Sequence, residues 1–296
     1  MSISCPRVTV IIPAYNRSRY IQQTLDSVFI QDYLNIELIA IDDGSNDGTY
    51  EILKKYQSNG QLTLLHHDNR ANKGQSASIN LGLEKSSGEF ICILDSDDLF
   101  AKEKISKQVS YLLRNPSVGL VYGNGKAIDE DNNELYTLHG ADHIETNDPN
   151  ALLLDCYFCL PVNALVRADV YKQVGRFNES FRAAQDHDMQ VRMAEIAEFA
   201  YIPDCLFYYR KHDDSISNKG ALTRWKNGIK ILEMAKTRYP YNQSTIKKRL
   251  AVLNYRLAKV YMDSGHYISA MGYYLHSAIL DPRRSIAVLT GRDTSI

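Results

Sequence analysis

Residues 90–98 read Phe-Ile-Cys-Ile-Leu-Asp-Ser-Asp-Asp, an apolar run that is followed at once by an acidic cluster. The apolar part lacks polar alternation, which is typical of a strand that is covered on both faces. Carboxylates this close together repel one another, and a hard divalent cation removes that repulsion. Oxygen ligands suit Mg²⁺ or Mn²⁺. We therefore predict a buried strand that ends at a divalent-cation site, with a solvated turn as the alternative.

Other apolar runs in residues 1–125 also predict buried strands, and helical patterns lie between them. The runs are Val8–Ile12, Ile36–Ile41, Leu62–Leu65 and Val118–Tyr122. One helical pattern places Ile21, Leu25 and Val28 on a single helix face. This alternation predicts an α/β fold in which a mostly parallel sheet is flanked by helices. Because such sheets bind ligands at the carboxyl ends of their strands, the residues after each strand are the candidates for a functional site.

The pattern changes in the second half of the chain. Residues 157–166 predict an extended segment, residues 184–197 a helix and residues 201–209 a strand. The remaining residues have helical spacing only. We therefore predict two domains, residues 1–218 and an all-α extension over residues 219–296.

Two helices of this extension resemble a single tetratricopeptide repeat. The matching positions are Leu257, Ala258, Tyr261, Ala270, Tyr274, Ser277 and Pro282. Asn254 stands where that motif has an aromatic residue. Because one such unit cannot bury both of its faces, two interpretations remain open: a helical hairpin that packs on the first domain, or a surface that binds a partner.

The composition of the 296 residues is that of an ordinary globular protein, with 44% hydrophobic and 23% charged residues. The formal net charge of −1 argues against nucleic acid as a partner. An odd count of five cysteines favours reduced thiols in the cytosol. No secretory signal and no membrane-spanning run is evident. We expect a cytoplasmic protein whose basic tail permits peripheral contact with the inner face of the membrane; the residues are Lys247, Lys248, Arg249, Arg283, Arg284 and Arg292.

Polar and aromatic residues follow the first two predicted strands. Residues 13–16 read Pro-Ala-Tyr-Asn, and the ring of Tyr15 is placed either to stack on a base or to pack on the end of the sheet. Residues 42–48 read Asp-Asp-Gly-Ser-Asn-Asp-Gly. Asp47 is expected to cap the helix that follows. One of the two leading aspartates is free to accept a hydrogen bond from a ring N–H or a ribose hydroxyl.

A second pair of carboxylates lies about 90 residues later, in Asp186-His187-Asp188 at the head of a predicted helix. Either aspartate can cap the helix, or one can act as a general base. His212, in the polar run after the last predicted strand, is either structural or a further metal ligand. No glycine-rich phosphate loop is present. A bound diphosphate would therefore need the metal to neutralise its charge.

These motifs together resemble the family 2 inverting glycosyltransferases, which have the GT-A fold. The match covers roughly residues 6–217, and the motifs occur in the family's order. They are Val8–Asn16, Ile41–Ser45, Asn72–Gly74 with Asn80, Gly88–Ile91 leading into Asp95–Asp98, Gly175–Glu179, Gln185–Met189 and Tyr209–His212.

The resemblance implies transfer of a sugar from a nucleotide-diphosphate donor, with uridine as the favoured nucleoside. Pro13 and Tyr15 would line the base site, and Asp43 would bond to the base. Asp95 would lie near the ribose, and the other substrate-binding candidates are Asn16, Asn72, Ser96 and Asp188. Asp97 and His212 would bind Mn²⁺ or Mg²⁺, and Asp186 would be the catalytic base. The acceptor would be a glycan or a lipid-linked molecule in cell-envelope polysaccharide or glycoconjugate synthesis.

The chain departs from the family's pattern at two positions. Gln185 stands where many members have glutamate, and Ile79 where many have arginine, so a second carboxylate and a phosphate contact are missing. The rival interpretations are a metal-dependent phosphatase, a nucleotidyltransferase and a non-catalytic scaffold that acts through the helical tail. The phosphatase would need the two acidic motifs in the reverse order, and the nucleotidyltransferase would need a glycine-rich loop after the first strand.

Overall fold

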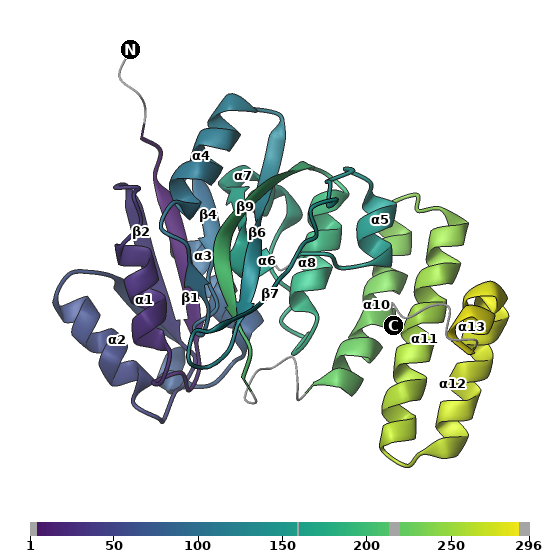
Figure 1. Ribbon diagram of the computed structural model, residues 1–296. Helices are drawn as coiled ribbons and strands as arrows, with labels where there is room; N and C mark the ends of the chain where they lie inside the picture. Colours follow the sequence, from purple (N-terminus) through teal and green to yellow (C-terminus); the bar gives the residue numbers. More distant parts are fainter. Residues whose placement is uncertain (1–4, 159, 213–219, 290–296) are drawn as a thin grey trace. The chain divides into compact units, whose positions relative to one another are not determined.

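The computed structural model describes residues 5–158, 160–212 and 220–289 (Figure 1). The chain forms two compact units, residues 1–147 with 158–213 and residues 148–157 with 214–296, called here unit 1 and unit 2. The predicted domain boundary at residues 218 and 219 lies outside the described residues.

Unit 1 is built on a nine-stranded sheet of the described residues, in the order β3-β2-β1-β4-β8-β6-β9-β5, with β7 beside β6. The strands are β1 (Val8–Ala14), β2 (Ile36–Asp42), β3 (Thr63–His66), β4 (Phe90–Ile93), β5 (Leu99–Phe100), β6 (Val118–Ile128), β7 (Glu134–Thr137), β8 (Ala164–Arg167) and β9 (Glu198–Arg210). Strands β3, β2, β1 and β4 are parallel, and β6 is parallel to β9. The pairs β4–β8, β6–β8, β5–β9 and β6–β7 are antiparallel. The predicted α/β fold class is confirmed, with a mixed sheet.

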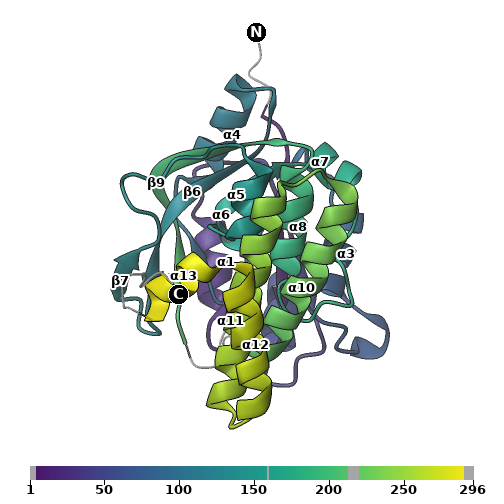
Figure 2. The same ribbon diagram turned by 90° about the vertical axis from the view of Figure 1, so that its right-hand side faces the viewer.

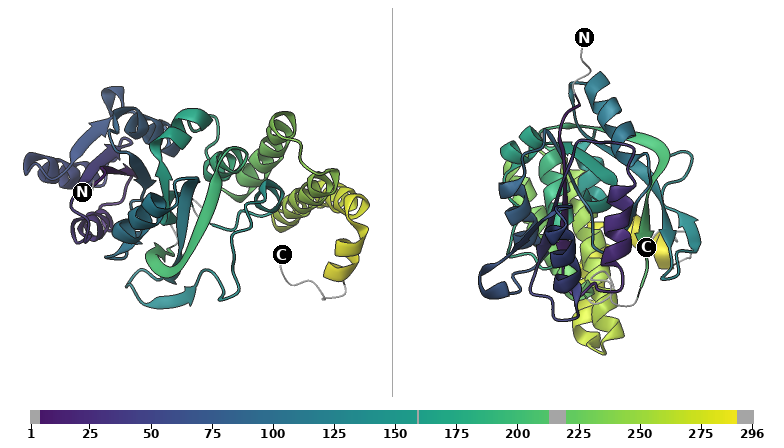
Figure 3. Two further views of the ribbon diagram at one scale, coloured as in Figure 1. Left: turned by 90° about the horizontal axis from the view of Figure 1, so that it is seen from above. Right: turned by 90° about the vertical axis from the view of Figure 1, so that its left-hand side faces the viewer.

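Helices cover both faces of this sheet (Figure 3). They are α1 (Ile21–Phe29), α2 (Thr49–Ser58), α3 (Gln75–Lys85), α4 (Lys104–Arg114), α6 (Leu160–Asn163), α7 (Ala168–Val174) and α8 (Gln185–Ala194), with a 3₁₀ turn η1 (Asp68–Arg70) before α3. Val8, Val10 and Ile12 of β1 pack in one core cluster with α1 and α4. Alternate side chains of a strand face opposite ways, so Ile11 meets α3 instead, where Gly82 leaves room for it. Burial on both faces explains why the strand sequences lack polar alternation.

Three segments differ from the prediction. Strand β1 continues through Pro13 to Ala14, which is tolerated because the pairing with β4 has ended at Ile11. Strand β6 runs on to Ile128, paired along its length with β9. The segment predicted as extended over residues 157–166 contains the short helix α6 before β8 begins. Short apolar runs do not distinguish a buried helix from a strand, and Pro161 lies in the first turn of α6, where proline is favourable.

Unit 2 is helical (Figure 2). It contains α5 (Pro149–Leu154), α10 (Ala221–Arg238), α11 (Gln243–Asp263), α12 (Tyr267–Leu280) and α13 (Pro282–Leu289). Helix α5 is capped by Asp148, which accepts a hydrogen bond from Asn150 N, and Arg249 of α11 donates 2.9 Å to Leu154 O at its other end. The helical unit therefore contains α5, from the middle of the chain, in addition to the helices of the predicted extension. Its likeness to a tetratricopeptide repeat stays a prediction.

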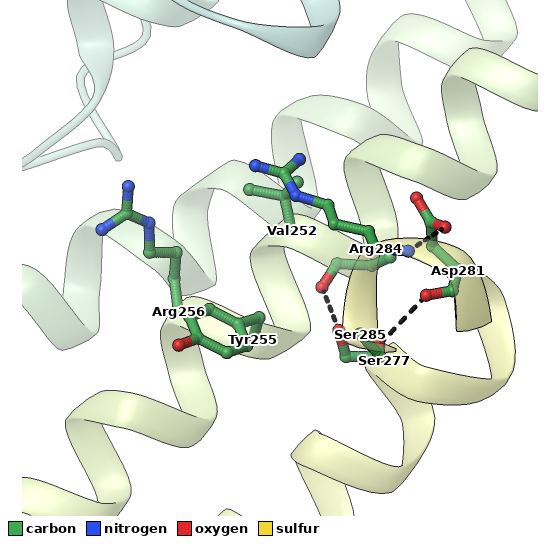
Figure 4. Close-up of a pocket in the computed structure, with 8 residues that line it drawn as sticks. Val252, Tyr255, Arg256, Ser277, Asp281, Arg284 and Ser285 are labelled. Atoms are coloured by element: carbon green, nitrogen blue, oxygen red, sulfur yellow. Dashed lines mark hydrogen bonds between the residues drawn. The ribbon is translucent and has the colours of Figure 1, made fainter. Parts of the chain in front are cut away.

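Helices α11, α12 and α13 meet around a small pocket (Figure 4). Ser277 Oγ donates 2.8 Å to Ala251 O and joins α12 to α11. Asp281 holds the start of α13, because its side chain accepts from Arg284 N at 3.1 Å and its carbonyl accepts from Ser285 Oγ at 3.0 Å. Arg256 lies 5.3 Å from the Trp225 ring. These contacts fix the turn between α12 and α13.

None of the described helices combines the length and the apolar character needed to cross a bilayer.

Stability of unit 1 is expected to fall with acid through the loop after β7. His139 and His143 stack at 4.2 Å between ring centroids beside Tyr122, and burial together with the neighbouring His143 lowers the pKa of His139 to about 4. The unfolded chain then binds more protons than the folded chain between about pH 6.5 and 4, so stability is complete above this window and is lost as the pH falls through it. We expect chemical unfolding of His139→Gln to depend less on pH across this window. An unchanged slope would contradict the assignment.

Candidate functional site

The candidate site lies where β1, β2 and β4 end at the same edge of the sheet. The loops after β1 and β2 are tied together, since Asn16 N donates to Ser45 Oγ at 3.0 Å and Asn46 N donates to Asn16 Oδ1 at 2.9 Å. Gly44 has φ of +79°, and a Cβ there would lie 2.5 Å from Arg70 O, so the turn after β2 requires glycine. The expected capping of α2 by Asp47 is wrong, because the N-cap residue is Gly48, whose left-handed φ of +98° only glycine adopts easily. Asp47 instead accepts from Thr49 N at 3.0 Å from one position before the cap.

Asp43 is 3% exposed and binds backbone rather than solvent. Its two carboxylate oxygens accept from Lys73 N at 2.7 Å and Gly74 N at 2.8 Å. The loop before α3 is thereby fixed against the end of β2. Tyr15, in contrast, is 44% exposed, while Pro13 is buried in β1. The ring of Tyr15 is therefore accessible at this edge, as stacking on a base requires.

Two basic side chains from distant parts of the chain contact Asp97. Its Oδ2 accepts from Arg17 Nε at 2.9 Å and lies 2.9 Å from His212 Nε2. Burial raises the pKa of Asp97, but the contacts with His212 and Arg17 outweigh it and hold that pKa below its ordinary value. The carboxylate is 15% exposed. It is thus an ionised, partly accessible group at the carboxyl edge of the sheet.

The neighbouring aspartates differ in environment. Asp95 Oδ1 accepts from Gln75 Nε2 at 2.6 Å, and burial together with the negative charges of Asp97 and Asp186 raises the pKa of Asp95 to about 7. Asp98 is buried, with Oδ1 accepting from Arg210 N at 2.8 Å. Its Oδ2 has no hydrogen-bond partner among the described residues, and burial with the charges of Asp97 and Asp95 raises its pKa. Ser96 is buried between them.

Asp186 lies in the first turn of α8 and is partly exposed. Its charge acts on Asp95, so the second acidic motif faces the first across the site. A chain of two glutamines connects them: Gln185 Nε2 donates to Gln75 Oε1 at 2.6 Å, and Gln75 donates in turn to Asp95. Gln185, which replaces the family's glutamate, therefore fixes the start of α8 through a neutral contact.

Two of the expected substrate-binding residues lie apart from this cluster. Asp188 is fully buried and pairs with Arg192 of its own helix, at 2.8 Å from Nη2 and 3.0 Å from Nε. Asn72 is exposed, and its Oδ1 lies 3.5 Å from Arg182 Nη1. The structure thus brings Asp95, Asp97 and Asp186 together but directs Asp188 into the core.

Four residues that contact the site have no role in the sequence prediction: Arg17, Gln75, Arg182 and Arg210. Arg17 directly follows the Pro13–Asn16 motif, and Arg210 precedes His212 by two residues, so position next to a motif was a usable signal. Arg182 rests on Gly74, where a Cβ would lie 2.2 Å from its Nη1. No described carboxylate forms an ion pair with Arg182, which leaves a cation beside the loop that Asp43 fixes.

Two side chains with donor atoms suited to a divalent cation, Asp97 and His212, meet at this edge. Asp97 and His212 already converge, and the unpartnered Oδ2 of Asp98 together with the raised pKa of Asp95 reflects carboxylates that lack compensating charge. No described group of three acidic, histidine or cysteine side chains is gathered as a metal site. Arg17 already lies on Asp97 and supplies one positive charge there.

The chain belongs to the family described as Glycosyl transferase family 2, whose sequence profile matches residues 9–175. An uncharacterized glycosyltransferase of Rickettsia felis is 29% identical over 225 residues, which cover 74% of this chain and 36% of the relative. The chain thus spans about a third of that relative's length.

Solved structures share the fold. The crystal structure of S. aureus TarS 1-349 in complex with UDP-GlcNAc has a TM-score of 0.70 and 18% identity, over 92% of this chain and 81% of that one. The mannosyltransferase PcManGT of Pyrobaculum calidifontis, in complex with GDP-Man and Mn²⁺, has a TM-score of 0.64 and 19% identity, over 98% of this chain and 80% of that one.

Proposed function

We propose that this enzyme transfers a sugar, with inversion, from a nucleotide-diphosphate donor to an acceptor hydroxyl, in polysaccharide or glycoconjugate synthesis. The observation that carries the proposal is the pairing of two acidic groups across one edge of the sheet. Asp97 is held ionised by Arg17 and His212, and Asp186 faces it beyond Asp95. Through a bound cation, Asp97 would serve the charged leaving group, and Asp186 would serve the acceptor.

On the donor side, the base would stack on the exposed Tyr15 ring. Each carboxylate oxygen of Asp43 accepts one hydrogen bond, from Lys73 N or Gly74 N, and has a second lone pair. With that lone pair, Asp43 would accept a hydrogen bond from the base. Asp95 and Ser96, with Asn16 of the loop after β1, would contact the ribose and phosphates, and Asn72 would reach the donor from the loop before α3. The ligands named for the TarS and PcManGT structures support a donor of this chemical class, and a uridine donor is the one we favour.

Asp97 and His212 would hold Mn²⁺ or Mg²⁺ in this site. When bound, the cation neutralises charge on the departing diphosphate. The imidazole and carboxylate already lie in contact, so the chain itself positions both donors. Arg17 would have to leave Asp97 or share it, and the diphosphate is the natural new partner of its guanidinium.

The transfer itself is assigned to Asp186. Its carboxylate accepts the proton of the acceptor hydroxyl while that oxygen forms a bond to C1 of the donor sugar. The bond between C1 and the diphosphate oxygen breaks, and the nucleoside diphosphate leaves with the electron pair. A single displacement of this kind inverts the anomeric centre. The glutamines that fix the start of α8 keep the base in place without adding a competing charge.

A panel of nucleotide sugars with Mn²⁺, measured by thermal shift and by release of nucleoside diphosphate, tests the function. Stabilisation by one donor, with slow release of its diphosphate, is the expected result. Turnover of p-nitrophenyl phosphate without donor binding would favour a phosphatase instead. Absence of any metal-dependent nucleotide binding would favour a non-catalytic scaffold.

Replacing Arg182 with alanine is expected to weaken nucleoside diphosphate binding about tenfold and to leave nucleoside binding unchanged. The reason is that a charge-assisted hydrogen bond to phosphate contributes about 1.5–3 kcal/mol. Because Arg182 is exposed, water replaces part of this contribution when the side chain is removed. Calorimetry with both ligands measures the difference, and Arg283→Ala is the matched exposed control in unit 2. Equal weakening for nucleoside and diphosphate would assign Arg182 a structural role.

A further inference from the structure

Helix α12 exposes an apolar stripe. Five of its large apolar side chains are between 63% and 91% exposed, and they are Tyr267, Ile268, Met271, Leu275 and Ile279. The helix contains no Asp, Glu, Lys or Arg. At 100° per residue, Ile268, Gly272, Leu275 and Ile279 fall within one narrow band along the helix. Single exposed apolar residues need no explanation, but a continuous stripe does.

The opposite side of α12 is already occupied within unit 2. Ala270 and Ser277 are buried, and Ser277 bonds to Ala251 of α11. Tyr273 stacks on Tyr261 of α11 at 5.4 Å between ring centroids. The inner side therefore accounts for the folding of the hairpin. The stripe is a second apolar side that the packing of the described residues leaves uncovered.

We propose that this stripe pairs with the same stripe of a second copy of this chain, as an antiparallel helix pair with two-fold symmetry. In a two-fold pair, a residue on one side of the midpoint of the stripe faces the partner's residue at the same distance on the other side of the midpoint. This pairing places Ile268 against Ile279, and Gly272 against Leu275. Gly272 has nothing within 4 Å of where a Cβ would lie, so the partner's Leu275 finds open space there. The stripe is thus self-complementary in size, with large against small at its centre.

Area and charge favour this occupant. A fully buried Leu, Ile or Met side chain removes about 60–120 Å² from water, so burying the five exposed side chains of both copies removes about 600–1,200 Å² in all, a range that reaches the lower limit for a specific interface. A helix that lies on an anionic membrane needs Lys or Arg beside its apolar residues; α12 has none, and the nearest in sequence, Arg283 and Arg284, belong to α13. A charged partner likewise finds no complement on it.

Sedimentation velocity of the full chain, from about 1 to 100 µM, tests the pairing. We expect the wild type to shift from monomer to dimer within this range and Leu275→Asp to stay monomeric. Leu34→Asp changes a residue that is 95% exposed in unit 1 and is the matched control, which should dimerise as the wild type does. Far-ultraviolet circular dichroism and thermal unfolding establish that each variant is folded.

A size exchange then tests the register. Gly272→Leu should fill the space that Leu275 needs and should weaken dimerisation at least tenfold, although it contacts nothing within its own chain. Adding Leu275→Ala to that variant again places a small side chain, at position 275, against a large one, at position 272 of the partner. The double variant should therefore recover at least part of the association. Failure of the double variant to recover would overturn the antiparallel register.

Other outcomes overturn the pairing itself. A wild type that stays monomeric up to 100 µM, or a dimer that Leu275→Asp leaves intact, would remove this face as the interface. A monomer that floats with vesicles of anionic phospholipid, and that Leu275→Asp releases, would assign the stripe to a lipid surface instead. Because the measurement needs no sugar donor, its result is independent of the proposed transferase chemistry.

Discussion

The Asp186→Asn enzyme is expected to lose transfer activity by about 10²–10⁴-fold while it binds the nucleotide donor as tightly as the wild type does. The reason is that asparagine keeps the shape of the side chain but cannot accept the proton of the acceptor hydroxyl, and general-base catalysis contributes this range. The amide also removes a negative charge that acts on Asp95, so the raised pKa of Asp95 should move towards its ordinary value.

Release of nucleoside diphosphate in the presence of acceptor measures kcat for this variant, and calorimetry measures its affinity for the donor. Asp263→Asn, an exposed isosteric change in unit 2, is the control for the handling of variants. A residual rate above about a tenth of the wild type would exclude Asp186 as the base. A parallel loss of donor affinity would indicate a binding role instead.

The second large effect is expected at Asp97. The wild type should bind nucleoside diphosphate at least about tenfold more tightly with Mn²⁺ than without it, and Asp97→Ala should abolish that difference. The cause is that Asp97 is the point where Arg17 and His212 converge, and its lowered pKa keeps it ionised as a ligand at neutral pH. Calorimetry with and without Mn²⁺ gives the ratio directly.

His212→Ala offers the matched comparison, because it removes the other proposed ligand and leaves the carboxylate. It should lower the Mn²⁺-dependent gain without removing the Arg17 contact. If Asp97→Ala retains the full gain, the cation is bound elsewhere, and if the wild type shows no gain, the cation is not used. Thermal unfolding without ligand is the check that loss of the Arg17 ion pair has not unfolded the site.

Much of unit 1 could be predicted because its order is local. Apolar runs without alternation located β1, β2 and β4, since burial on both faces leaves that signature in the sequence. Strand β3 was also located by its apolar run, although only Leu64 of it is buried. The α6 helix could not be found this way, because an apolar run before β8 satisfies either structure. The grouping of α5 with the C-terminal helices depends on contacts such as that of Arg249 with Leu154, between residues almost a hundred positions apart.

The candidate site divides in the same way. Asp95 and Asp97 directly follow a buried strand, so topology alone placed them at the ligand edge. Gln75 directly follows the Asn72–Gly74 motif, and Arg182 lies between two motifs, but only the folded chain shows their contacts. The burial of Asp188 against Arg192 is likewise invisible in a motif that places it two residues from Asp186.

The carboxylate of Asp43 has one further consequence. Because both of its oxygens are bound to amides of the loop before α3, that loop acquires its shape when the protein folds and not when a ligand arrives. A molecule entering there loses little conformational entropy of the protein on binding. If the proposed donor binds there, its selection would rest on fit to a preorganised surface, and a donor of the wrong shape would gain nothing from rearrangement of the loop.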